Sequence, residues 1–257
     1  MLQLLASLGR VFIDFIGSVG RLGLFTGNAV SHIVRPPYYG RILLRQILEI
    51  GFYSLPVVGL TAVFTGMVLA LQTYTGFQRF AAESAVAAVV VLSMTRELGP
   101  VIAGLMLAGR IGASVAAEIG TMRVTDQIDA LTTLSTNPYK YLVAPRLVAA
   151  LITLPVLVLV ADVIGVFGGF LVATYKLGFN PSAYLARTIN TMQSVDVVSG
   201  LVKAAAFGFV VTLMGCYHGY YSRGGAQGVG SATTYAVVSG SIMILLTNYL
   251  MTAIFFS

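Results

Sequence analysis

Five long apolar stretches, separated by short polar segments, dominate the chain. A helix needs about 20 apolar residues to cross the hydrocarbon core of a bilayer, and each stretch is long enough. The stretches cover about residues 50–75, 84–113, 144–175, 198–221 and 233–256. The pattern therefore predicts an all-α integral membrane protein with about five transmembrane helices.

The first 30 residues show a different pattern. Large apolar side chains recur there at helical spacing, but Arg10, Asp14 and Arg21 interrupt them. Such a helix lies in the membrane interface, whereas an ordinary first span would place Arg10 and Asp14 in hydrocarbon at appreciable cost. We therefore expect an interfacial amphipathic helix and connector over 1–45, followed by a transmembrane bundle over 46–257.

Composition supports a membrane location. Only 9% of the residues are charged, 57% are hydrophobic and the mean hydropathy is +0.89, whereas soluble domains carry about a quarter charged residues. Most of the surface must face lipid, and no soluble domain is left over, so residues 1–257 are expected to form one domain. The net charge of +6 comes from basic residues dispersed beside apolar runs, which favours anionic lipid head groups over nucleic acid as the partner.

The basic residues also predict an orientation, because cytoplasmic loops carry an excess of Lys and Arg. If the N-terminus is cytoplasmic, most of the basic residues share the cytoplasmic side. These are Arg10, Arg21, Arg35, Arg41, Arg45, Arg110, Arg123, Lys140, Arg146 and Arg223. The other side receives only Arg79, Lys176 and Arg187, with Lys203 just inside the fourth span.

Small residues recur every three or four positions in three of the spans. They are Ala62, Gly66 and Ala70; Gly104, Ala108, Gly112 and Ala116; and Gly165, Gly168 and Gly169. Such stripes let helix backbones approach closely, because tight packing replaces the hydrophobic drive that lipid removes. We interpret them as packing surfaces.

The segment 117–140 is too polar to span the membrane and too patterned for a slack loop. Thr125 followed by Asp126 and Asp129 favours a helix start, with carboxylates near the positive end of the dipole. Apolar residues accompany these charges, namely Met122, Val124, Ile128 and Leu131. The pattern favours a short helix over a merely solvated loop. Such a helix would lie parallel to the membrane and offer charges and apolar side chains to a soluble partner.

Several motifs in this order resemble the MlaE permease family, the membrane subunits of bacterial Mla lipid-transport ABC systems with relatives in Mce systems and chloroplasts. The motifs are Gly66 to Gln72, Arg96 to Pro100, Ala108 to Gly112, Ala117 to Leu131, Asn137-Pro138, Pro145-Arg146 and Gly228 to Thr234. The resemblance covers nearly the whole chain. It implies a single permease domain in the bacterial inner membrane that moves phospholipid and maintains outer-membrane lipid asymmetry.

The resemblance also implies partners and site residues. The expected partners are a second copy of the chain, a cytoplasmic ABC ATPase that binds ATP and Mg, a periplasmic MCE-domain lipid carrier and often a STAS-domain protein. The segment 117–140 would be the cytoplasmic coupling helix between spans 2 and 3, with Glu118, Arg123, Asp126 and Asp129 as coupling candidates.

A lipid pocket is implied at the dimer interface near the outer leaflet. The matching positions are Leu69, Gly76, Phe77 and Phe80, with Arg45 nearer the interfacial helix. Phe77 and Phe80 suit acyl chains, whereas Arg45 and Arg79 suit the phosphate.

Two charged residues, Arg96 and Glu97, fall well inside the second apolar stretch. Ionisable groups at that depth are costly and normally face a partner or a wet cavity. Adjacent helical residues point about 100° apart, so each is expected to find its partner on another helix or on the second copy. The two either line the lipid cavity or form buried ion pairs that fix helix register. The same two alternatives, a lining of the lipid cavity or a buried ion pair, apply to Asp162 and Lys203.

No catalytic set emerges from the residues. The glycine-rich run 225–230 has Ser231 where a phosphate-binding loop needs lysine, and His32 and His218 lack companions for a metal. We expect no catalytic, cofactor or metal site, so energy must come from another polypeptide. Two alternatives stay open: an ion-coupled secondary transporter using Glu97 and Asp162, and a non-transporting membrane scaffold.

Overall fold

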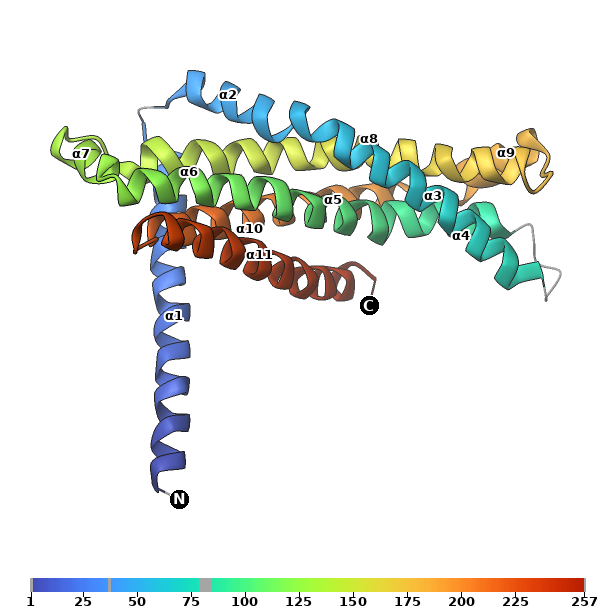
Figure 1. Ribbon diagram of the computed structural model, residues 1–257. Helices are drawn as coiled ribbons and strands as arrows, with labels where there is room; N and C mark the ends of the chain where they lie inside the picture. Colours follow the sequence, from blue (N-terminus) through green and yellow to red (C-terminus); the bar gives the residue numbers. More distant parts are fainter. Residues whose placement is uncertain (1, 37, 79–84, 257) are drawn as a thin grey trace.

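The structure, a computed structural model, describes residues 2–36, 38–78 and 85–256 as a helical bundle (Figure 1). Its α-helices are α1 (Leu2–Val34), α2 (Gly40–Ile50), α3 (Leu55–Phe77), α4 (Val86–Ser93), α5 (Gly99–Leu107), α6 (Ala113–Val124), α7 (Gln127–Thr133), α8 (Ala144–Tyr175), α9 (Pro181–Thr191), α10 (Ser194–Tyr220) and α11 (Gly225–Phe256). Wide π-helical turns at Met94–Leu98 and Ala108–Gly112 join α4, α5 and α6 into one rod, and a third at Tyr139–Val143 leads into α8.

Five helical segments are long and apolar enough to cross a membrane. They are Gly40–Phe77, Val86–Val124, Tyr139–Tyr175, Ser194–Tyr220 and Gly225–Phe256. The prediction of an all-α protein with five spans is therefore confirmed. All five helical segments begin or end at least four residues outside the predicted stretches, because hydropathy marks only the most apolar part of a helix whose backbone hydrogen bonds continue beyond it.

The N-terminal helix α1 crosses the bundle instead of running along it (Figure 1). It lies near the end that also carries α7 and the turn between α10 and α11, which we call the α7 end. The opposite end, with α9 and the end of α3, is the α9 end. Since α1 is not among the five candidate spans, this arrangement fits the predicted interfacial helix.

An aromatic cluster attaches α1 to the bundle. Phe25 of α1 is fully buried, and its ring centre lies 5.3 Å from that of Tyr139, 5.5 Å from Tyr217 and 5.8 Å from Tyr220. Aromatic side chains gather at membrane–water boundaries, where an apolar ring and a polar hydroxyl are both satisfied. The composition of the cluster is therefore typical of a membrane–water boundary.

Glycines allow the spans to pack backbone against backbone. A Cβ added to Gly66 of α3 would overlap the carbonyl oxygen of Gly165 in α8, and one added to Gly168 would overlap that of Val63. The second stripe faces α10, where a Cβ on Gly219 would lie 2.9 Å from the carbonyl oxygen of Ala116. The prediction that the small residues are packing surfaces is confirmed.

Candidate functional site

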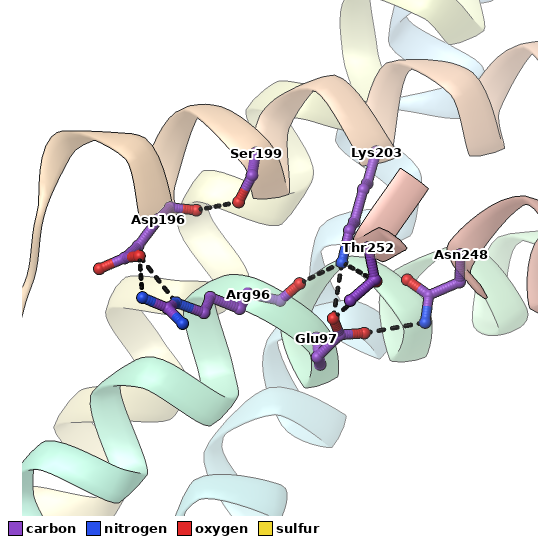
Figure 2. Close-up of polar contacts among 7 residues, drawn as sticks. All are labelled: Arg96, Glu97, Asp196, Ser199, Lys203, Asn248 and Thr252. Carbon is purple, nitrogen blue, oxygen red and sulfur yellow. Dashed lines mark hydrogen bonds and ion pairs between the residues drawn. The ribbon is translucent and has the colours of Figure 1, made fainter. Parts of the chain in front are cut away.

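A cluster of polar residues joins the rod that contains α4 and α5 to α10 and α11 (Figure 2). We call it the polar cluster. Its members are Arg96, Glu97, Asp196, Ser199, Lys203, Asn248 and Thr252. Arg96 and Glu97 come from the π-helical turn Met94–Leu98, and the others come from α10 and α11.

The sequence around Pro100 explains the local geometry. Proline has no N–H, so the carbonyl of Arg96, four residues earlier, loses its usual helical partner. The ammonium group of Lys203 donates to this carbonyl over 2.9 Å. The helix is also widened here, because the Gly99 N–H bonds to the carbonyl of Met94. Instead of a simple kink at Pro100, the structure has a π-helical turn just before it, a feature found frequently at functional sites.

Glu97 is held by both α10 and α11. Its Oε1 accepts hydrogen bonds from Lys203 Nζ at 2.7 Å and from Thr252 Oγ1 at 2.9 Å. Its Oε2 accepts from Asn248 Nδ2 at 2.8 Å. Lys203 is fully buried and also donates to Thr252 over 2.7 Å. Each charge therefore has a partner of opposite sign, and the ion pair ties three spans together.

Arg96 makes a separate ion pair. Its Nε and Nη2 both lie 2.7 Å from Oδ1 of Asp196, which is fully buried. Oδ2 of Asp196 accepts from the backbone N–H of Gln193 and so caps α10. The Arg96 guanidinium also lies over the ring of Phe256 at 4.4 Å. The expectation that Arg96 and Glu97 pair with other helices is confirmed.

The depth of these charges in a membrane stays a prediction. Asp196 is the third residue of α10 and Phe256 is the last of α11, so Arg96 lies where these two spans end. The second span has 39 residues, about 58 Å of helix, which far exceeds a hydrocarbon core of about 30 Å. The position of a residue within that apolar stretch therefore does not fix its depth.

The coupling segment contains the predicted helix but not the predicted cap. Asp126 adopts a left-handed backbone conformation with φ of 58°, turns the chain after α6 and makes no capping bond. Asp129 pairs instead with Arg123, with Oδ1 and Nη1 2.7 Å apart. Glu118 lies apart from this group and pairs over 2.8 Å with Arg146, which is buried in α8.

The apolar side chains of the segment do not face outward as expected. Ile128 is fully buried, and Met122 and Leu131 pack against the core of the bundle. Only Leu134, just after α7, is a strongly exposed large apolar residue in this segment, at 75%. Sequence spacing alone could not show whether these side chains face the bundle or a partner, because a helix face has the same residue spacing in either case.

The predicted lipid-pocket residues lie at two ends of the molecule. Leu69 lines an apolar groove of about 390 Å³ on α3 that extends to Leu98, next to Glu97. Gly76 and Phe77 follow about two turns after Leu69, at the α9 end. Arg45 is exposed in α2, separated from them by most of α3, about 35 Å of helix. The structure does not bring Arg45 to this group, and Phe80 and Arg79 lie outside the described residues.

Five apolar spans, with the Arg96–Asp196 and Glu97–Lys203 ion pairs between them, define a multi-pass membrane protein. Residues 43–254 match the family model described as Permease MlaE. The chain therefore belongs to the MlaE permease family, as the motifs indicated. It is the membrane subunit of an ABC transporter and not its ATPase.

Several relatives are similar over most or all of this chain. A probable ABC transporter permease protein of Rickettsia felis is 61% identical over 100% of this chain and 99% of its own. The intermembrane phospholipid transport system permease protein MlaE of Haemophilus influenzae is 34% identical, covering 100% and 98%. Protein TRIGALACTOSYLDIACYLGLYCEROL 1, chloroplastic, of Arabidopsis thaliana is 33% identical, covering 91% and 67%.

Proposed function

We propose that this chain is the phospholipid-moving permease of a bacterial inner-membrane ABC system, with its N-terminus in the cytoplasm. The observation that carries the proposal is the apolar groove on α3, which has walls suited to hydrocarbon and reaches Leu98, beside the ion pair of Glu97 and the buried Lys203. The family membership and the relative named for phospholipid transport support it. In this proposal an MCE-domain protein in the periplasm exchanges lipid at the α9 end and maintains outer-membrane asymmetry.

A second copy of the chain would complete the pocket. The first and fifth spans are the least buried of the five. The first carries the groove, and the fifth carries Asn248 and Thr252, which donate hydrogen bonds to Glu97. Two copies meeting along these spans would enclose acyl chains between Leu69, Phe77 and their counterparts.

The second span supplies a mechanical connection from the ATPase to the groove. It runs as one rod from the turn at Asp126 to the polar cluster, with Glu97 about 40 Å from Val124 along the axis. A cytoplasmic ATPase, with or without a STAS-domain protein, would contact Asp126, Asp129 and Leu134, which are exposed. Movement of this turn would then shift Glu97 relative to Lys203 and open or close the groove.

Replacement of Asp129 by alanine tests the coupling contact. The exposed pair with Arg123 adds little to stability, so the chain should stay folded and inserted. We expect the affinity for the ATPase to fall about tenfold, equivalent to about 1.4 kcal/mol, as measured by co-purification and lipid-stimulated ATP hydrolysis. Thr133→Ala, also on the exposed side of α7, is the control. Unchanged ATP hydrolysis in the Asp129 variant would remove this residue from the contact.

Replacement of Glu97 by glutamine tests transport itself. The variant keeps the size of the side chain but leaves Lys203 without its counter-charge. We expect the protein to insert normally and to lose transfer of a fluorescent phospholipid between vesicles that contain the whole complex. Full transfer by both this variant and Asp129→Ala would refute the site assignments.

The same transfer assay distinguishes the alternative functions. Transfer driven by an ion gradient without ATP would favour a secondary transporter, and no transfer by the unaltered complex would favour a scaffold.

A further inference from the structure

A pocket of about 220 Å³ lies at the α7 end, where the connector between α1 and α2 meets the start of α8 (Figure 1). We call it the connector pocket. It shares no lining residue with the groove on α3, and the proposed transport path does not use it. Ile33, Leu43 and Val148 form apolar parts of its wall, and Lys140 brings a positive charge to it.

Lys140 can bind a ligand in the connector pocket. Its ammonium group donates to the backbone carbonyl of Pro36 at an exposed contact, and an ammonium has three hydrogen atoms to donate. His32 also lines the pocket, but its two ring nitrogens already contact the Asn28 carbonyl and the Asn137 amide. Among the side chains that the structure describes, Lys140 makes no ion pair. Its charge and further N–H donors are therefore available to an anion.

The segments that form the pocket contain no carboxylate. The lining residues fall within 32–43 and 140–148, and the sequence has neither Asp nor Glu from 15 to 48 or from 130 to 161. Arg35 and Arg41, beside the pocket in the chain, are exposed and make no ion pair with a described side chain. Arg45, which does not reach the groove on α3, is exposed one turn after Arg41. A cluster of cations without counter-charges, next to a membrane, attracts anionic lipid head groups.

An apolar strip on α8 leads away from the pocket. Val148 lines the pocket, and Ile152 and Val156 follow it at four-residue spacing with exposures of 48% and 58%. Residues four apart lie on one face of a helix, so the strip begins at the pocket and continues toward the α9 end. A ligand that joins an anionic group to hydrocarbon matches both the pocket and the strip.

We propose that the connector pocket binds a phospholipid with a net negative charge. Its phosphate accepts hydrogen bonds from Lys140, and one acyl chain lies along Ile152 and Val156. The nearby arginines favour an anionic head group over a zwitterionic one. Such a lipid contacts the connector and α8 together, and so holds the α1–α2 connector against the bundle. It comes from the surrounding leaflet and is not the transported lipid, so the inference does not rest on the proposed function.

The test compares phosphatidylglycerol with phosphatidylcholine of identical acyl chains, because only the first has a net negative charge. Each lipid is titrated into the purified protein in detergent, and bound lipid is measured by native mass spectrometry. We expect the unaltered chain to prefer phosphatidylglycerol about tenfold, the effect of one charge-assisted hydrogen bond. Lys140→Met should abolish most of this preference, whereas Lys176→Met, at the opposite end of α8, should retain it. Equal binding of both lipids by the unaltered chain, or the same preference in all three proteins, would overturn the proposal.

A second pair of variants tests the pocket without touching its charge. Gly40 lines the pocket, and an added Cβ there meets no atom within 4 Å, so Gly40→Phe should fill the space without disturbing the fold. We expect it to lose the preference for phosphatidylglycerol. Gly23→Phe on α1, where a Cβ also meets no atom within 4 Å, should keep it. Unchanged binding in Gly40→Phe would contradict the assignment.

Glycerol 3-phosphate distinguishes a lipid from a soluble anion. It carries the same phosphate chemistry but no acyl chain, so it cannot use the strip on α8. We expect an excess of it to leave phosphatidylglycerol bound to the unaltered chain. Displacement of the lipid would show that the pocket recognises a soluble phosphate, and the proposal would be wrong.

Discussion

Replacement of Lys203 by methionine is expected to lower the free energy of unfolding by about 1–3 kcal/mol, the usual cost of leaving a buried polar group without its partner. Lys203 is fully buried and donates to Glu97, to Thr252 and to the carbonyl of Arg96. Methionine fills similar volume but leaves the Arg96 carbonyl without its donor, and Glu97, whose side chain is 37% exposed, keeps only Asn248 and Thr252 as partners. Thermal unfolding in detergent, followed by circular dichroism, measures the change.

The matched control is Lys176→Met, which removes an exposed lysine at the end of α8 and should change stability by less than about 0.5 kcal/mol. Adding Glu97→Gln to the Lys203 variant removes the stranded charge. The double variant should therefore recover part of the loss, because residues in one network couple by about 0.5–3 kcal/mol. A Lys203→Met chain as stable as the unaltered protein would show that the pair is not buried as described.

Replacement of Gly66 by alanine is the second change with a large expected effect. Its new Cβ would overlap the backbone carbonyl of Gly165, which no side-chain rotation can relieve. The crossing of α3 and α8 would have to widen, at a cost of about 3 kcal/mol, at the upper end of typical overpacking effects. We expect a lower midpoint of thermal unfolding and less folded protein after extraction.

Gly59→Ala is the control in the same helix, two turns earlier on the same face. A Cβ there would meet Ile164 Cδ1 at 3.5 Å, an ordinary contact. Since alanine favours a helix over glycine by about 1 kcal/mol, this variant should be as stable as the unaltered chain or more stable. If both alanine variants behaved alike, the close approach at Gly66 would be disproved.

The spans and their packing surfaces could be predicted because they follow from local patterns. The thickness of the bilayer fixes the length of an apolar stretch, and the spacing of Ala62 and Gly66 directly marks one helix face. The partners of Glu97 could not be predicted in this way. Asn248 and Thr252 lie 151 and 155 residues after Glu97 in the sequence. Their four-residue spacing places both on one face of a helix, but the sequence does not show which residue that face contacts.

Direction and depth were harder to infer than helical structure. The apolar residues around Ile128 were expected to face a partner, but they pack into the bundle. The depth of Arg96 stays a prediction, because a helix longer than the membrane has no sequence mark where the lipid ends. Both questions concern where a helix sits relative to its surroundings, which helical periodicity does not specify.

The spans end at unequal heights at the α9 end. The spans formed by α10 and α11 stop near Arg96, whereas the rod continues through α4 to Val86, about 15 Å farther. At this end α11 stops short of α3, α8 and α9 (Figure 1). Exposing hydrocarbon to water costs about 0.8 kcal/mol per CH₂, so in the proposed function longer helices that cover even a few methylenes of a departing lipid would lower the barrier to its transfer.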